Sequence, residues 1–253
     1  MNTASQRRLI LAIDTTGSPG SIALVSEAGG SAYEVMEEVQ MDSPEGFGQV
    51  LFGEIDALLG RAGVGVRDIA AFASASGPGS FTGVRIGLTA VKGLGEATGR
   101  PVIAVSNLQA LASYGTASSG SAPLRAVLMD ARRGEIFGAV YNSALELVQE
   151  EIVIRIEEWL ASLPGDVEFI IPTIVSDAER SMVEALSQNR PVHKITQAPG
   201  AIAGAIGRIA LDRLWRGSQL GVVQDPAEVD ANYVRRSDAE LLWKDPNAVK
   251  VPL

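Results

Sequence analysis

The sequence predicts an α/β protein with two lobes, each a mixed sheet flanked by helices. Apolar runs up to residue 113 follow the order β-β-β-α-β-α-β-α, and hairpins followed by alternating helices and strands favour a mixed sheet covered by helices. A pattern of strand, Asp, Gly-containing turn and strand occurs twice, as LAIDTTGSPGSIALV and AVLMDARRGEIFGAVY, which indicates a duplicated domain. Between the two copies, the small and polar residues 116–123 are typical of a domain boundary.

Short apolar runs between turn-forming residues predict the strands of the first lobe. These runs occupy residues 9–13, 21–25, 32–39, 69–75 and 102–105. Apolar side chains at helical spacing predict helices over about 45–59 and 80–98, the first of them ending at Gly60 or Gly63. Ser106 is a favourable N-cap for a third helix that runs to about residue 113.

The second half is predicted to contain three strands and two helices. The strands occupy residues 124–129, 135–141 and 145–156, and the helices 176–188 and about 201–215. The last helix is rich in small residues, including Gly204 and Gly207, which permit close approach to a sheet. We therefore expect an N-terminal lobe over residues 1–115, a smaller second lobe over 116–200 and a C-terminal helix and tail over 201–253, with the helix near 200–217 packing back on the first lobe.

The composition excludes several classes of enzyme. The 253 residues include no cysteine and one histidine, His193. Disulfides, cysteine nucleophiles, iron–sulfur clusters, thiolate zinc sites and two-histidine metal sites are therefore impossible. A Ser-His-Asp triad would depend entirely on His193, which lies in a polar stretch typical of the surface.

Charge and hydropathy predict a cytoplasmic protein that does not grip nucleic acid by itself. Asp14 interrupts the apolar run after the basic N-terminus, so no secretory signal is expected. The longest charge-free apolar stretch, within residues 195–207, is too short to span a membrane. The net charge is −9, and the arginine doublets at 7–8, 132–133 and 235–236 form no basic stripe of the kind that phosphate backbones require.

A glycine-rich segment, SGPGSFTGVRIG at residues 76–87, joins a predicted strand to a predicted helix. Such a loop at a helix N-terminus can bind anions. A Walker A loop is excluded, because no lysine occurs before Lys92. A dinucleotide fingerprint, and with it a nicotinamide-dependent oxidoreductase, is disfavoured because the position that needs an acidic residue holds Ser106 or Asn107.

The glycines continue into the predicted helix. Relative to alanine, Gly83, Gly87, Gly93 and Gly95 together cost the helix about 3–4 kcal/mol. Gly79, Gly83 and Gly87 recur at every fourth residue, so they share a face to which another backbone can come close. A neighbouring element of the same chain and a partner protein explain this spacing equally well.

Each predicted hairpin carries an aspartate where its first strand ends, Asp14 before Thr15 and Thr16, and Asp130 in the second half. The paired hairpins resemble those of the actin, sugar-kinase and acetate-kinase superfamily. In that superfamily they face each other across a cleft, their turns hold phosphates, and an Asp positions the metal. The alternative is that each Asp is an ordinary turn former.

The segment FASASGPGSFTGVRIGLTAVKGLG resembles the signature of the TsaB/YeaZ family. The family's hallmark is GxGPGSFTGxRxG, and only its first glycine differs, being Ala75 here. LILAIDTT resembles the family's opening strand, AVLMDARRGEIF its second-domain hairpin, and ANYVRRSDAELLWK its C-terminal Tyr-x-Arg segment. The resemblance extends over about residues 8–244 and is weakest over 142–192.

This resemblance implies the actin/sugar-kinase-like (ASKHA) fold and kinship with the glycoprotease-like protein TsaD. TsaD transfers the threonylcarbamoyl group to the adenosine beside the anticodon of tRNA. The resemblance implies a non-catalytic subunit that pairs with TsaD, works with the ATPase TsaE and forms a homodimer when alone. The histidine pair that binds the metal of TsaD has no counterpart in residues 42–52, so no catalytic or metal-binding residue is expected.

We expect no tightly bound cofactor, with ATP or ADP and Mg only at the level of the complex, and tRNA contact only through the complex. Asp14, Thr15, Thr16 and Asp130 would then be a vestigial phosphate loop. The rival hypothesis is an active phosphotransferase that uses Asp14 and Asp130 around Mg²⁺.

The partner surface is expected on the helices at 45–59 and 80–98, lying side by side and facing a similar pair on a partner. Gly83 and Gly87 would let the second pair approach closely, with apolar side chains of the first helix as anchors. The residues expected at this surface are Phe47, Val50, Leu51, Gly79, Ser80, Phe81, Thr82, Gly83, Val84, Arg85 and Gly87.

Overall fold

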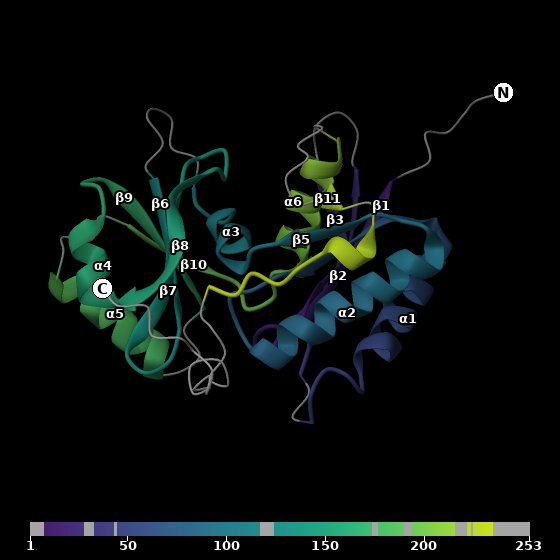
Figure 1. Cartoon of the computed structure of the whole chain (residues 1–253), viewed down its shortest axis with the longest axis horizontal. Coiled ribbons are helices and arrows are strands. Elements are labelled where there is room, and N and C mark those ends of the chain that lie inside the picture. Colours follow the sequence, from purple (N-terminus) through teal and green to yellow (C-terminus); the bar gives the residue numbers. More distant parts are fainter. Residues whose placement is uncertain are drawn as a thin grey trace, which may run out of the picture.

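The computed structural model describes residues 8–27, 33–42, 45–116, 124–173, 177–189, 194–215, 222–223 and 225–234. These residues form two mixed sheets that stand side by side with helices around them (Figure 1). The elements in chain order are β1 (Leu9–Asp14), β2 (Gly20–Glu27), β3 (Tyr33–Met41), α1 (Leu51–Ala62), η1 (Val66–Asp68), β4 (Ile69–Ala75), α2 (Phe81–Thr98), β5 (Val102–Val105), α3 (Asn107–Ala112), β6 (Leu124–Asp130), β7 (Glu135–Tyr141), β8 (Leu147–Arg155), α4 (Ile156–Ser162), β9 (Val167–Pro172), α5 (Asp177–Asn189), β10 (Ile195–Ala198), α6 (Ala203–Trp215), β11 (Val222–Val223) and η2 (Pro226–Glu228).

The two sheets repeat one topology. The first has the strand order β11-β5-β4-β1-β2-β3, and the second has the order β10-β9-β6-β7-β8. In each, the first strand pairs antiparallel with the next strand and parallel with the fourth, as β1 does with β2 and β4, and β6 with β7 and β9. This repeat confirms the predicted fold class of two mixed sheets flanked by helices.

The core is layered, and the first strand shows why. All six residues of β1 are buried, because both faces of the first sheet are covered. Leu11 and Ile13 belong to the cluster that includes α1 and α2, whereas Ile10 and Ala12 belong to the cluster that includes α3 and α6. Since side chains alternate along a strand, α1 and α2 lie on one face of this sheet and α6 lies on the other.

Helices α3 and α6 cross between the two sheets. Helix α3 follows a strand of the first sheet and contacts β6, β7 and β9 of the second. Helix α6 follows a strand of the second sheet and contacts β1, β2, β3, β4 and β5 of the first, as predicted for the helix at 201–215. The exchange gives the two sheets one shared hydrophobic cluster.

Several predicted boundaries change. Helix α1 begins at Leu51 instead of residue 45, because Gly46 has a left-handed φ of 97° and residues 47–50 form a turn. The helix ends where Gly63 is left-handed, with φ of 68°. Strands β9 and β10 and helix α4 were not predicted at all.

Some predictions fall outside the described residues. They concern residues 117–123 of the domain boundary, His193 and the Arg235–Arg236 doublet. The domain limits themselves therefore stay a prediction. Within the described part of the chain, no helix is both long and apolar enough to cross a membrane.

The glycine face of α2 packs against the chain's own β1–β2 turn. A Cβ atom added to Gly83 would lie 1.9 Å from the carbonyl oxygen of Thr15, and one added to Gly87 would lie 2.7 Å from Ser74 Oγ. A Cβ atom added to Gly79 would lie 2.8 Å from Cβ of Thr16. The expectation that Gly83 and Gly87 open the outer face of the helix to a partner is therefore wrong.

The variant Gly83→Ala should be strongly destabilised, because the added methyl group has no room beside the Thr15 backbone. We expect a loss of about 3 kcal/mol in the free energy of unfolding, measured by urea denaturation. Gly93→Ala on the same helix is the matched control, since nothing lies within 4 Å of a Cβ atom added there. It should gain up to about 1 kcal/mol. Equal stability of Gly83→Ala and wild type would show that the contact is not tight.

Candidate functional site

The β1–β2 turn is closed by a chain of hydrogen bonds. Asp14 Oδ1 accepts from the backbone N of Thr16 at 2.9 Å and from Thr16 Oγ1 at 2.6 Å. Asn107 Nδ2 donates to the same Thr16 hydroxyl at 2.6 Å, and the backbone N of Gly77 donates to Asn107 Oδ1 at 3.0 Å. The aspartate of the predicted phosphate loop is therefore joined to the loop before α2 and to the start of α3.

Helix α2 holds the same turn from the other side. Thr15 Oγ1 donates to the carbonyl oxygen of Gly83 at 2.7 Å, and the backbone N of Ser80 donates to the carbonyl oxygen of Thr16 at 2.8 Å. Ser80 Oγ accepts from the backbone N of Gly83 at 3.2 Å, which caps the helix. The N–H groups of Thr16, Ser80 and Gly83 are thus used within the chain, and an incoming phosphate would have to displace these bonds.

Burial dominates the electrostatics of Asp14. The side chain is 3% exposed, and its burial raises the pKa of the carboxyl group above its usual value. Hydrogen bonds from Thr16 and Asn107 oppose this shift without reversing it.

The second hairpin also uses its aspartate locally. Asp130 Oδ1 accepts from the backbone N of Arg132 at 2.8 Å, and Arg132 Nε lies 3.8 Å from Asp130 Oδ2. Arg132 and Arg133 have φ values of 66° and 60°, so this bond supports a turn in the left-handed region, where arginine is uncommon. The ordinary role of a turn-forming Asp accounts for these contacts.

Both hairpins border one cavity of about 1100 Å³. Asp14, Thr15, Thr16 and Asp130 all line it, as the comparison with the two-hairpin superfamily implied. The N-terminus of α6 also reaches this cavity, but Ser21 Oγ accepts from the backbone N atoms of residues 202 and 203 at 3.2 and 3.1 Å. No three His, Cys, Asp or Glu side chains of the described residues are grouped so as to hold a metal ion.

A partly buried polar cluster around Glu151 joins the two sheets. Glu151 Oε1 accepts from Tyr141 Oη at 2.5 Å and from Ser106 Oγ, and Glu151 Oε2 accepts from Asn232 Nδ2 at 2.5 Å. Burial, together with the nearby Glu151 carboxylate, raises the pKa of the Tyr141 hydroxyl, which therefore stays a donor. The carboxylate connects β8, β7, the start of α3 and the segment after η2.

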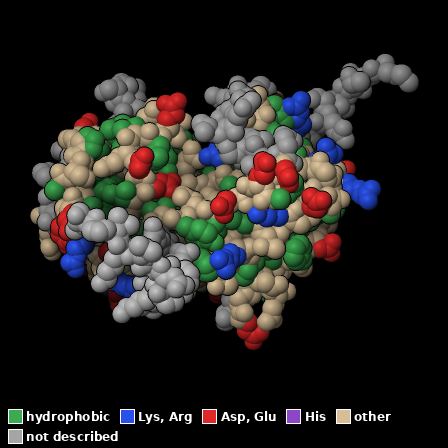
Figure 2. All heavy atoms as spheres, in the orientation of Figure 1, with side chains coloured by type: hydrophobic (Ala, Val, Ile, Leu, Met, Phe, Trp, Pro, Cys, Tyr) green, Lys and Arg blue, Asp and Glu red, His purple; other side chains and the backbone are tan. Residues whose placement is uncertain are grey.

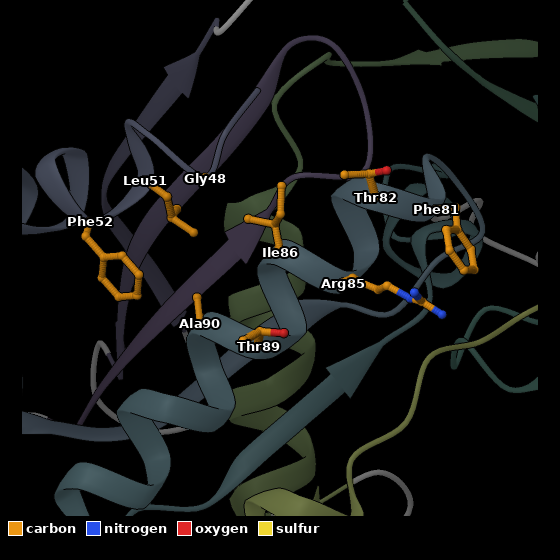
Figure 3. Close-up of a pocket in the computed structure, with 9 residues that line it drawn as sticks. All are labelled: Gly48, Leu51, Phe52, Phe81, Thr82, Arg85, Ile86, Thr89 and Ala90. Atoms are coloured by element: carbon orange, nitrogen blue, oxygen red, sulfur yellow. The ribbon is translucent and has the colours of Figure 1, made fainter. Parts of the chain in front are cut away.

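An apolar groove of about 450 Å³ lies between α1 and α2 on the outside of the first sheet. Figure 2 shows hydrophobic side chains at the surface over these two helices, with single basic side chains among them. In the close-up of Figure 3, Phe52 and Phe81 stand toward opposite ends of the groove, and Ile86 lies between them. Phe52 is 57% exposed and Phe81 is 40% exposed, which is unusual for phenylalanine in a folded protein.

The predicted surface residues divide into two sets. Phe47 and Leu51 are buried in the core beneath α1, and Val84 is buried beneath α2, so Phe47 and Leu51 are not exposed anchors. Val50 is half-buried, and Gly83 and Gly87 face inward. The predicted residues that lie exposed are Gly79, Ser80, Phe81, Thr82 and Arg85.

Three residues of interest were missed by sequence reasoning. Phe52 follows the predicted anchor Leu51 but lies on another face of the helix; because the face with Leu51, Ile55 and Leu58 is buried against the chain's own sheet, Phe52 is left on the outer face. Tyr233 belongs to the Tyr-x-Arg segment of the family resemblance, but its ring contact with Phe81, with centroids 5.4 Å apart, spans a separation in sequence that no local pattern reveals. Glu151 lies in the stretch where the family resemblance is weakest.

Comparison with known proteins identifies the family. A family model described as "TsaD: tRNA N6-adenosine threonylcarbamoyltransferase" matches residues 46–184, which is more than half of the chain. The tRNA threonylcarbamoyladenosine biosynthesis proteins TsaB of Bacillus subtilis and Escherichia coli are 33% and 35% identical over 61% and 53% of the chain. The chain belongs to the TsaB/YeaZ branch of the TsaD family.

A solved structure agrees with this TsaB/YeaZ assignment over most of the chain. YeaZ from Pseudomonas aeruginosa superposes with a TM-score of 0.71 at 27% identity, covering 89% of this chain and 99% of that one. The sequence matches to the two bacterial TsaB proteins are shorter and span 65% and 54% of their own lengths.

The raised pKa of Asp14 makes a prediction about stability and pH. A raised pKa means that the folded state binds the proton more tightly than the unfolded state does, between the unfolded value of 3.8 and the folded value. The stability that Asp14 contributes is therefore greatest below pH 3.8 and falls as the pH rises through that window, by up to about 1.4 kcal/mol per pH unit. In Asp14→Asn the amide oxygen still accepts from Thr16, but this dependence is removed.

The pH dependence of the free energy of unfolding is measured by urea denaturation of wild type and Asp14→Asn from pH 3.5 to pH 7, at steps of about half a pH unit. The free energy of unfolding of wild type, minus that of Asp14→Asn, should fall as the pH rises. A difference that stays flat or rises would contradict the assignment.

Proposed function

We propose that the chain is a non-catalytic, dimer-forming subunit that supports TsaD in transferring the threonylcarbamoyl group to the adenosine beside the anticodon of tRNA. The names of the two bacterial relatives place them in the biosynthesis of this modified nucleoside. The observation that carries the proposal is the exposed apolar groove between α1 and α2, on a helix whose inner face closes the phosphate-loop turn.

The closed turn supports the non-catalytic role. Phosphoryl transfer requires hydrogen-bond donors and a metal cation that are available to bind the phosphate oxygens. Here Thr16 N, Ser80 N and Gly83 N are hydrogen-bonded to the chain, and Oδ1 of Asp14 accepts two hydrogen bonds from Thr16. We propose that the loop is vestigial, that no cofactor is tightly bound, and that ATP or ADP and Mg act only in the assembled complex.

The groove supports the partner role. A monomer gains nothing from exposing two phenylalanines at the two ends of one concave surface, whereas an interface buries such aromatic groups at its centre. We propose that TsaD, which is related in fold, places its own helix pair here and that a second copy of this chain occupies the groove when TsaD is absent. TsaE joins this complex, which acts in the cytoplasm, and tRNA binds through the complex because the chain has a net charge of −9.

The alternative function is phosphotransfer. The placement of Asp14 and Asp130 along one cavity favours it.

Incubation with ATP and Mg²⁺ separates the two functions. We expect the purified chain to neither hydrolyse ATP nor modify tRNA alone, and Asp14→Asn to behave as wild type does. Phosphate release that is robust in wild type and disappears in Asp14→Asn would instead establish the phosphotransferase.

Substitution in the groove tests the partner surface. Phe52→Asp places a charge in the apolar groove and should weaken binding to the TsaD of the same organism by about thirtyfold, which corresponds to about 2 kcal/mol. Val148→Asp on β8 is the matched control, because Val148 is 53% exposed and Phe52 is 57% exposed. Calorimetric titration against TsaD measures both. Unchanged affinity of Phe52→Asp for TsaD would show that the groove is not part of the interface. If wild type itself does not bind TsaD, the proposed partner is wrong.

A further inference from the structure

Arg85 gives the Phe81 end of the groove a charged group that is held in place. It is the one charged residue among the nine that line the groove, all of which lie in the described part of the chain. Its guanidinium carbon lies 3.9 Å from the centroid of the Phe81 ring, and its Nε donates to Tyr233 Oη at 3.2 Å. Figure 3 shows the side chain extending from α2 toward Phe81.

The fixed guanidinium has donors to spare. Stacking on Phe81 and the bond to Tyr233 use one face and one N–H group. No residue of the described ranges accepts a hydrogen bond from either terminal nitrogen of Arg85, and the side chain is exposed. In the free protein these nitrogens are hydrated, whereas a partner that covers the groove removes that water.

We infer that Arg85 selects the partner, and that the groove prefers a helical surface of TsaD that brings a carboxylate to this guanidinium. Covering an arginine with apolar groups alone leaves its donors unpaired, which costs affinity, and a carboxylate matches the two terminal nitrogens in a bidentate pair. A second copy of the chain offers the same groove with the same cation. A symmetric contact therefore buries two guanidiniums and provides no carboxylate from the groove-lining residues. The inference rests on the proposed function, since it assumes that the groove receives TsaD.

Three substitutions separate charge from shape. Arg85→Met keeps an apolar side chain of similar length, Arg85→Lys keeps the charge, and Arg85→Glu reverses it. Lys92→Met is the matched control, because Lys92 is a basic residue of the same helix whose Nζ points to the carbonyl oxygen of Ala227, 3.4 Å away, and does not line the groove. Melting temperatures verify that each variant is folded.

Two measurements are made on every sample: affinity for TsaD at low and high salt, and the homodimer dissociation constant by sedimentation. We expect Arg85→Met to bind TsaD at least about tenfold more weakly, to lose the salt dependence of wild type and to form a tighter homodimer. Arg85→Lys should stay within about fivefold of wild type, Arg85→Glu should be weakest, and Lys92→Met should match wild type.

The inference is overturned if Arg85→Met binds TsaD as tightly as wild type, or if it weakens homodimer and heterodimer equally. These results leave the proposed function standing as long as Phe52→Asp fails to bind. If wild type itself does not bind TsaD, both the proposed function and this inference are wrong.

Discussion

The contact between the glycine face of α2 and the backbone of the β1–β2 turn determines the rest of this structure. Only a helix without side chains at Gly83 and Gly87 can come so close that Thr15 Oγ1 donates to a carbonyl oxygen inside the helix. The same approach brings Ser80 N within 2.8 Å of the Thr16 carbonyl oxygen. The turn is thus hydrogen-bonded to the chain's own helix on one side, while Asp14, Thr15 and Thr16 still line the cavity on the other.

The side chains on the outer face of α2 are determined by the glycines on its inner face. Because the small residues are turned inward, the larger side chains Phe81, Arg85 and Ile86 are left on the outside, where α1 adds Phe52. The glycines lower the helix propensity of α2, but their close contact with the β1–β2 turn accounts for their presence without a partner. The exposed aromatic surface, by contrast, has no counterpart within the described residues, so the groove and not the glycine face points to a partner.

Local patterns in the sequence predicted the elements well where an apolar run ends at a turn-forming residue, as β4 does at Ser76 and β5 at Ser106, and the limits of both strands were predicted to the residue. They failed for β9, where Glu168 interrupts the run. Its carboxylate is satisfied by the Thr116 backbone, 52 residues away, and by Thr196, 28 residues away. The spacing of the glycines predicted that they share one face of α2. It could not predict that this face contacts Thr15, because the position of Thr15 depends on the tertiary fold. The apolar face of α1 had the same limit, since its spacing was correct but it packs on the chain's own core, which buries Phe47 and Leu51 and leaves Phe52 exposed.

The two sheets are fixed to each other by both apolar and polar contacts. Helices α3 and α6 cross between them into one shared hydrophobic cluster, and Glu151 accepts hydrogen bonds from both sides. Opening the cavity would break these partly buried hydrogen bonds and expose that hydrophobic cluster, which disfavours a hinge. Asn232 belongs to the same arrangement, because its backbone N donates to the carbonyl oxygen of Ser76 and its side chain donates to Glu151. The next residue is Tyr233, which accepts a hydrogen bond from Arg85, so the charged end of the groove is positioned by the contact that fixes one sheet to the other.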